Sequence, residues 1–205
     1  MEETRELREA RLLQRRLEDE RRRNAERAEV LSQWIQPGGV GAELGVFQGR
    51  FSRTLLDTTQ ASKLHLIDPW YFLTPAWHWG WGSRSTVDAV IGVLSDFKPE
   101  IETSRVLVHV ADDRAVLRTF PDGYFDWVYI DSSHQYAHTC DELEILVHKV
   151  KAGGLIAGDD WRPDPAHRHH GVYRAVQERL AAGIFTLAGA DEATAQWAVR
   201  LPAQA

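Results

Sequence analysis

The feature that most constrains the fold of this chain is a regular alternation of short apolar runs and longer helical stretches between residues 40 and 201. Strands that alternate with helices at this spacing form βαβ units, which build a mostly parallel sheet. The predicted strands cover residues 40–46, 63–67, 105–110, 127–130, 155–157, 184–188 and 196–201, and the predicted helices cover 49–58, 85–97, 114–120, 137–150 and 172–182. The last two strands have no helix between them and should form an antiparallel hairpin. The expected fold class is α/β, with an antiparallel last strand and helices on both faces of the sheet.

Two of the predicted helices are followed by residues that stop a helix. Pro99 should end the helix over residues 85–97. The Lys-Ala-Gly-Gly segment at 151–154 should end the helix over residues 137–150.

A charged segment precedes the alternating region. Residues 3–35 are predicted to form one long helix, because Glu, Arg, Leu and Ala dominate and no Gly or Pro interrupts them. Its apolar stripe is thin, so two interpretations stay open: a solvated helix whose last turns pack on the body, or an arm that forms a homodimer. Residues 36–39 stop the helix. The expected domains are an N-terminal helix over 1–36 and a globular domain over 37–205.

The charge and hydropathy of the chain argue against several kinds of partner. The net charge is −6, whereas binding to phosphates needs a basic face, so we expect no nucleic-acid partner. No apolar run approaches the ~20 residues that span a bilayer, and the charged N-terminus lacks the apolar segment of a signal peptide. The single cysteine, Cys140, weakly favours a reducing compartment. We therefore expect a soluble, cytoplasmic protein without a membrane partner.

The first predicted strand ends in a turn that suits a nucleotide-like ligand. It reads Glu-Leu-Gly-Val-Phe-Gln-Gly and holds Glu43, Gly45 and Gly49. Ligands of such sheets bind beyond the carboxyl ends of the strands, where two glycines allow close approach and a helix offers its first amides. The dinucleotide fingerprint G-x-G-x-x-G is absent. A plain tight turn remains the alternative.

Acids at the next two strand ends strengthen this interpretation. Asp68 ends the second strand and can accept hydrogen bonds from ribose hydroxyls, and Asp113 follows the third strand. The whole arrangement, over residues 40–201, resembles class I S-adenosylmethionine-dependent methyltransferases, whose first motif is an acid followed by G-x-x-x-G. The resemblance implies a Rossmann-like class I sheet with S-adenosylmethionine bound by Glu43, Gly45, Gly49, Asp68 and Asp113, the last of them at the adenine.

The fourth and fifth strands end in the most specific motifs of the chain. They read Tyr-Ile-Asp-Ser-Ser-His-Gln and Ala-Gly-Asp-Asp-Trp, and they contain Asp131, Asp159 and Asp160. They resemble metal-dependent O-methyltransferases of the macrolide-sugar type and, more distantly, those acting on catechols and caffeoyl esters; a looser likeness is to mycobacterial methylmannose-polysaccharide methyltransferases. The resemblance implies that these three aspartates bind a divalent cation.

Elementary electrostatics supports a cation at this place. Neighbouring parallel strands end within about 5 Å of each other, where three carboxylates would repel without a cation. Oxygen ligands favour Mg²⁺ or Mn²⁺ over zinc. The alternatives are that Asp159 and Asp160 cap a turn, and that the enzyme is a metal-independent methyltransferase of the same fold.

A histidine follows the fourth strand at the distance expected of a catalytic base. His134 comes three residues after Asp131, where the catechol-type enzymes that the chain resembles carry a catalytic lysine. An imidazole is a competent base near neutral pH, although a surface or structural role is the alternative for any histidine. His138 lies one helical turn further on. We predict His134 as the base and His138 as the substitute base or a substrate contact.

Two loops are candidates for the acceptor site. One covers residues 69–82 and includes Trp77, Trp79 and Trp81. Their side chains would bind a sugar or a flat apolar ligand, with a satellite core or a dimer surface as alternatives. The other covers residues 161–171, and its polar side chains would line the acceptor cleft or a lid: Asp164, His167, His169 and His170.

These residues together predict methyl transfer to an acceptor hydroxyl, with a sugar or saccharide such as a mannoside favoured over a phenol or another small molecule. A weakly acidic aliphatic hydroxyl benefits most from a metal and a base together. A non-catalytic protein that uses its helix for interaction is the alternative from another class.

Overall fold

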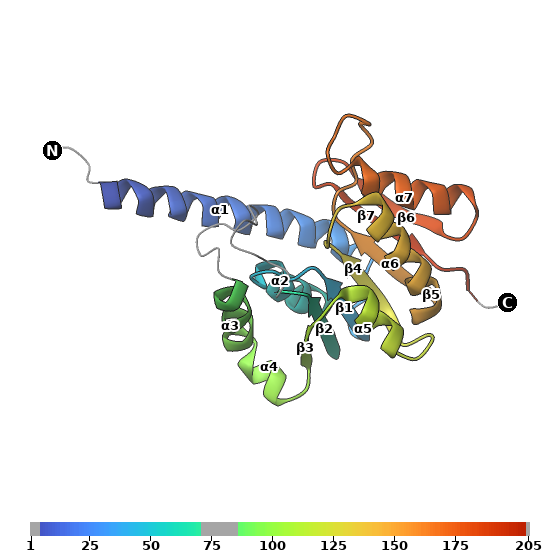
Figure 1. Ribbon diagram of the computed structural model, residues 1–205, viewed down its shortest axis with the longest axis horizontal. Helices are drawn as coiled ribbons and strands as arrows, with labels where there is room; N and C mark the ends of the chain where they lie inside the picture. The colour runs from blue at the N-terminus through green and yellow to red at the C-terminus, as the bar shows by residue number, and fades with distance from the viewer. Residues whose placement is uncertain (1–4, 71–85, 204–205) are drawn as a thin grey trace.

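The computed structural model describes residues 5–70 and 86–203 of the chain (Figure 1). The predicted acceptor residues Trp77, Trp79 and Trp81 lie outside these residues. The helices are α1 (Arg5–Ser32), α2 (Arg50–Thr59), α3 (Thr86–Asp96), α4 (Lys98–Glu102), α5 (Asp113–Thr119), α6 (Tyr136–Lys149) and α7 (His170–Ala181). The strands are β1 (Val40–Leu44), β2 (Lys63–Asp68), β3 (Val106–Val110), β4 (Phe125–Ile130), β5 (Val150–Gly158), β6 (Thr186–Asp191) and β7 (Gln196–Arg200).

The described strands form one sheet in the order β3-β2-β1-β4-β5-β7-β6. Strands β1 to β5 pair in parallel, whereas β7 lies antiparallel to both β5 and β6. The strand order reverses between β1 and β4, which both lie at the centre of the sheet. Ligands of α/β sheets bind at this kind of reversal, beyond the carboxyl ends of the strands. The predicted fold class and the predicted β6–β7 hairpin are confirmed.

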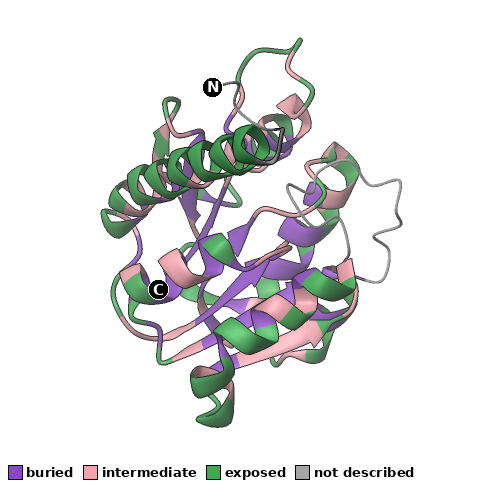
Figure 2. Ribbon diagram, turned by 90° about the vertical axis from the view of Figure 1, so that its left-hand side faces the viewer, coloured by how far each residue is buried: buried purple, intermediate pink, exposed green. Residues whose placement is uncertain are grey.

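Helices cover both faces of the sheet, as the alternation predicted. Apolar side chains of α5, α6 and α7, such as Leu146 and Val176, form one core with Val128 and Ile156. Side chains of α1, α2 and α3 form the second core on the opposite face of the sheet, together with the strand side chains that point to that face. Strands that are buried on both faces carry near-continuous apolar runs, and Figure 2 shows them inside a shell of partly exposed helices.

The long first helix joins the body only through its C-terminal part. Leu31 and the following Ile35 are 1% and 3% exposed in the core beside α2. The N-terminal half projects beyond the body, and Leu7, Leu12 and Leu13 are exposed on it (Figure 1). The structure therefore supports packing of the last turns on the body, and a homodimer formed through this helix stays a prediction. No described helix is both long enough and apolar enough to cross a membrane.

The helices α3 and α6 end within one residue of their predicted ends, at Asp96 and Lys149, but the residues that follow them differ from the prediction. Pro99 lies in the first turn of α4 and so does not end α3, which stops at Asp96. Proline is tolerated there because the first helical amides have no partner within the helix. Residues 151–154 belong to β5, which begins directly after α6 at Val150. The pairing of β5 with β4 shifts in register over this segment, and this irregularity accommodates the glycines.

Candidate active site

A cavity of about 810 Å³ lies at the carboxyl ends of the central strands, where the strand order reverses. This volume is within the roughly 300–1,000 Å³ of small-molecule sites. The predicted residues that line the cavity are Glu43, Gly45, Asp68, Asp113, Asp131, His134, His138 and Asp159. Helix α1 forms one wall through Arg23, Asn24 and Arg27. Most of the predicted strand-end residues therefore line one cavity. Helix α1 also lines it, which the motifs did not indicate.

The glycine turn after β1 requires a residue without a side chain. Gly45 has φ of 86°, and a Cβ atom there would lie 2.1 Å from the carbonyl oxygen of Asp131. Gly49 has φ of 71° and precedes α2, but it does not line the cavity. Only glycine adopts this conformation at low cost, so the turn brings its backbone close to the cavity.

Asp68 holds this turn in place. Its Oδ2 atom accepts hydrogen bonds from the amides of Val46 and Phe47 at 2.9 and 2.8 Å, and its Oδ1 atom accepts one from Trp70 at 2.9 Å. Burial raises the pKa of Asp68, although these hydrogen bonds oppose the shift. Asp68, which was predicted to bind the ribose, thus also holds the loop beside the cavity in shape.

Glu43 is buried at the base of the cavity. It is 1% exposed, and burial raises the pKa of its carboxyl group to about 8. At neutral pH the side chain is therefore mostly protonated and adds little negative charge to the site.

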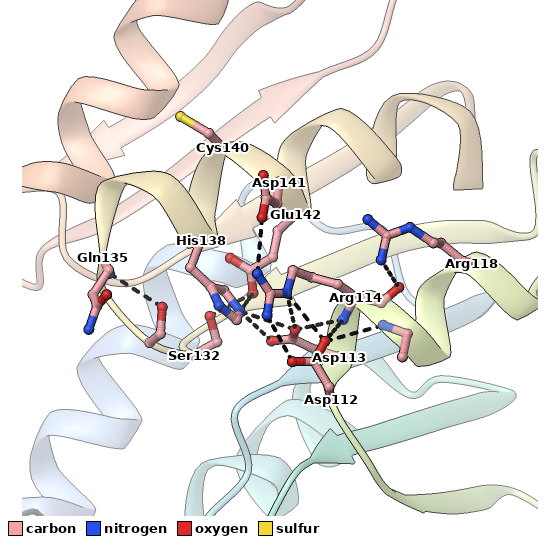
Figure 3. Close-up of polar contacts among 12 residues, drawn as sticks. Asp112, Asp113, Arg114, Arg118, Ser132, Gln135, His138, Cys140, Asp141 and Glu142 are labelled. Carbon is pink, nitrogen blue, oxygen red and sulfur yellow. Dashed lines mark hydrogen bonds and ion pairs between the residues drawn. The ribbon is translucent and has the colours of Figure 1, made fainter.

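His138 lies between two buried acids, as Figure 3 shows. Its Nε2 atom is 3.0 Å from Oδ2 of Asp113 and 3.6 Å from Oε1 of Glu142, which also accepts a hydrogen bond from Ser132. Burial alone lowers the pKa of His138, but the two acids raise it to about 10. The imidazole is protonated at neutral pH and cannot take a proton. The raised pKa disfavours the predicted role of His138 as a substitute base.

This charge cluster leads to a stability prediction. We expect His138→Gln to lower the free energy of unfolding by about 3 kcal/mol at pH 7, because Asp113 and Glu142 lose their buried cation. The raised pKa means that the stabilisation is complete below the unfolded value near 6.5 and disappears as pH rises through about 10. Urea titrations at pH 7 and 10, with the exposed His148→Gln as control, measure the difference. An equal loss at both pH values would contradict the charged role of His138.

An arginine lies between Asp131 and Asp159 at the wall of the cavity. The Nη2 atom of Arg27 is 3.0 Å from Oδ2 of Asp131 and 2.9 Å from Oδ2 of Asp159. The same atom donates to the hydroxyl of Tyr129 at 2.7 Å, and the guanidinium carbon lies 4.2 Å from the ring centre of Phe51. Nothing in the sequence singled out Arg27 among nine arginines of the helix region. Only the apolar residues after it indicated that this part of the helix packs on the body.

Asp160, the third predicted metal ligand, faces two histidines and not Arg27. Asp160 has φ of 66°, and its Oδ2 atom lies 2.8 Å from Nδ1 of His134 and 2.5 Å from Nδ1 of His169. Among the described residues, the groups close enough to share an ion are His134–Asp160–His169 and Asp113–His138–Glu142. The structure therefore does not bring the three predicted ligands together: Arg27 contacts Asp131 and Asp159, whereas His134 and His169 contact Asp160.

His134 has the surroundings of an oriented base. Its Nδ1 atom faces Asp160, and its Nε2 atom lies 3.9 Å from Oδ1 of Asp131 at the cavity. Its ring stacks on that of His169, with centres 4.5 Å apart. Burial lowers the pKa of His134, but the hydrogen bond that it donates to Asp160 and the charge of Asp131 raise it overall. A carboxylate on one ring nitrogen fixes the tautomer and leaves the other nitrogen for proton transfer.

The predicted polar residues of the acceptor loop contact the loop itself. Asp164 accepts a hydrogen bond from the amide of Ala166, and His167 accepts one from the amide of His169. The ring of His170 contacts the carbonyl of Arg162. None of Asp164, His167, His169 and His170 lines the described cavity, so their direct role in binding an acceptor is not supported. Arg162 is the residue of this loop that does line it.

The strand order and the cavity at its reversal define the fold of a class I methyltransferase. A family model described as a methyltransferase domain matches residues 42–161, which is more than half of the chain. The chain belongs to this family. A comparison with curated protein sequences gives no significant match.

Solved structures with the same fold come from several bacteria. A proposed rRNA-methylase from Clostridium thermocellum has a TM-score of 0.59 and 10% identity, over 88% of this chain and 96% of its own. A Bordetella parapertussis protein proposed to be exported has a TM-score of 0.57 and 16% identity, over 89% and 68%. A proposed methyltransferase from Streptococcus mutans, solved with SAH, has a TM-score of 0.55 and 12% identity, over 86% and 95%. At these identities the likeness establishes the fold.

Proposed function

We propose that the protein transfers the methyl group of S-adenosylmethionine to a hydroxyl group of an acceptor. The observation that carries this proposal is the convergence of the glycine turn, the strand-end acids and His134 on one cavity. The fit is supported by the volume of the cavity and by the turn at Gly45, whose backbone lines it. The family match and the S. mutans structure with SAH support the same donor.

The residues of the chain have separate roles in the proposed reaction. The sulfonium of the bound donor supplies an electrophilic methyl group. Asp68 keeps the turn after β1 in the shape that approaches the donor. Asp160 fixes the tautomer of His134, whose Nε2 atom takes the proton of the acceptor hydroxyl. The walls of the cavity align the acceptor oxygen with the methyl group for in-line attack.

We propose a saccharide or glycoside hydroxyl as the acceptor, with a phenol or another small molecule as the alternative. The support is the resemblance of the two strand-end motifs to macrolide-sugar O-methyltransferases. A base held by a carboxylate suits an aliphatic hydroxyl, whose pKa lies far above that of a phenol.

An acceptor screen tests this proposal. Donor with a labelled methyl group is incubated with mannosides, glucosides and catechols, and products are detected by mass shift. We expect labelled saccharides in which the label is attached to oxygen. Turnover of catechols alone would contradict the sugar acceptor and leave O-methylation intact, whereas label on nitrogen or carbon would contradict O-methylation.

A further inference from the structure

We propose that Arg27 of the N-terminal helix takes the place and the charge of a divalent cation in this active site, so that the enzyme works without a metal ion. The inference rests on the proposed methyl transfer. It makes α1 part of the catalytic domain, although the motifs of the sequence placed the active site wholly within residues 37–205.

The first argument is the charge at the ends of β4 and β5. Asp131 and Asp159 direct one oxygen each to the same nitrogen of Arg27, at 3.0 and 2.9 Å. Both carboxylates are 23% exposed and the guanidinium is 15% exposed, so water screens the three charges only in part. Two acids this close need a cation between them, and Arg27 supplies one from within the chain.

The second argument is that the space is shaped for a guanidinium group. The ring of Phe51 covers the planar face of Arg27 at 4.2 Å, as cation–π contacts require. The hydroxyl of Tyr129 accepts from Arg27 and donates to Gln196 at 2.7 Å. Gln196 in turn donates to Oδ1 of Asp159 at 2.8 Å, so both oxygens of that carboxylate are engaged.

The third argument is that a metal ion fits these residues poorly. Mg²⁺ requires near-octahedral oxygen ligands. Here Gln196 donates to one carboxylate oxygen of Asp159, and Arg27 contacts the other. The carboxylate of Asp160 faces His134 and His169 instead. A metal ion at this place would have to displace the largely buried side chain of Arg27, which would then lose its contacts with Phe51 and Tyr129.

The position of Arg27 also links it to the proposed base. Arg27 holds Oδ2 of Asp131, while Oδ1 of the same carboxylate lies 3.9 Å from Nε2 of His134. Arg27 is therefore a positioning residue, because it fixes the carboxylate next to the base. The adjoining Arg23 and Asn24 line the same cavity, so α1 closes the site from one side.

Binding of Mn²⁺ tests the inference independently of turnover. We expect the wild-type protein to bind no Mn²⁺ at millimolar concentration by calorimetry, and its turnover to stay within twofold after treatment with a chelator. Arg27→Met should bind Mn²⁺, because it leaves Asp131 and Asp159 without a cation. The double variant Arg27→Met with Asp159→Asn should lose that binding. Arg22→Met, which changes an exposed arginine of the same helix, is the matched control.

Turnover of the variants completes the test. Arg27→Met should reduce turnover about 10-fold or more without added metal, and Arg27→Lys should recover part of it because the positive charge returns. Tight Mn²⁺ binding by the wild type that Asp159→Asn abolishes, or chelator-sensitive turnover that Mg²⁺ restores, would overturn the inference. If Arg27→Met fails to fold, these two measurements still decide. Donor binding is measured in parallel, since its absence would instead refute the proposed methyl transfer.

Discussion

Replacing His134 by alanine should lower turnover by about 10²-fold or more, which is the usual contribution of a general base. The Nε2 atom of His134 faces the cavity, and Asp160 holds the opposite ring nitrogen at 2.8 Å. His138 is not expected to replace it, since that imidazole is protonated between Asp113 and Glu142. We expect donor affinity to stay within twofold, so steady-state kinetics should show the loss in kcat.

The pH dependence separates a base from a structural residue. The pKa of His134 is raised overall, although burial alone would lower it, so turnover should rise with pH through a value above that of an ordinary histidine. This rise should disappear in His134→Ala. The exposed His148→Ala serves as the control and should retain the wild-type profile. A His134→Ala variant within threefold of wild-type turnover would assign the proton transfer to another group.

Gly45→Ala should weaken donor binding by about 100-fold or more. A Cβ atom at Gly45 would lie 2.1 Å from the backbone carbonyl of Asp131, which cannot turn away as a flexible side chain can. The turn after β1 must then shift away from the shape that approaches the donor, and a 100-fold loss of affinity corresponds to about 3 kcal/mol of binding free energy. Calorimetry with the donor measures the effect.

The matched control for this variant is Gly123→Ala. Gly123 has a similarly positive φ of 63°, but no atom lies within 4 Å of its added Cβ. Both variants carry the backbone cost of about 1 kcal/mol for a left-handed residue, and only Gly45→Ala adds a collision. Equal donor affinity in the two variants would show that the turn does not form the donor site.

The periodic features of the sequence were sufficient to predict the sheet. Apolar runs such as the one in β4 and stop signals between them gave the βαβ order, because central strands such as β4 are buried on both faces. The role predicted for Pro99 was wrong because proline suits the start of a helix as well as its end. The strand-end acids were found for the same topological reason: parallel strands end at one edge of the sheet.

Side-chain orientation could not be predicted in this way. Asp159 and Asp160 are neighbours in sequence, yet the left-handed backbone at Asp160 turns its carboxylate to the histidines. Arg27 contacts Asp131 across 104 positions, and no local pattern distinguishes it from the solvated arginines of the same helix. The position of His138 after Asp131 suggested a base, but Glu142 and Asp113, which lies on a different helix, raise the pKa of its imidazole.

Isothermal calorimetry with S-adenosylmethionine and its demethylated product tests the central proposal most directly. We expect the wild-type protein to bind both with one site per chain, and the Gly45→Ala variant to bind neither detectably at the same concentrations. The site requires only the cavity at the reversal of the strand order, so no metal need be added. The absence of binding of either compound at millimolar concentration would contradict the assignment of this cavity as a methyl-donor site.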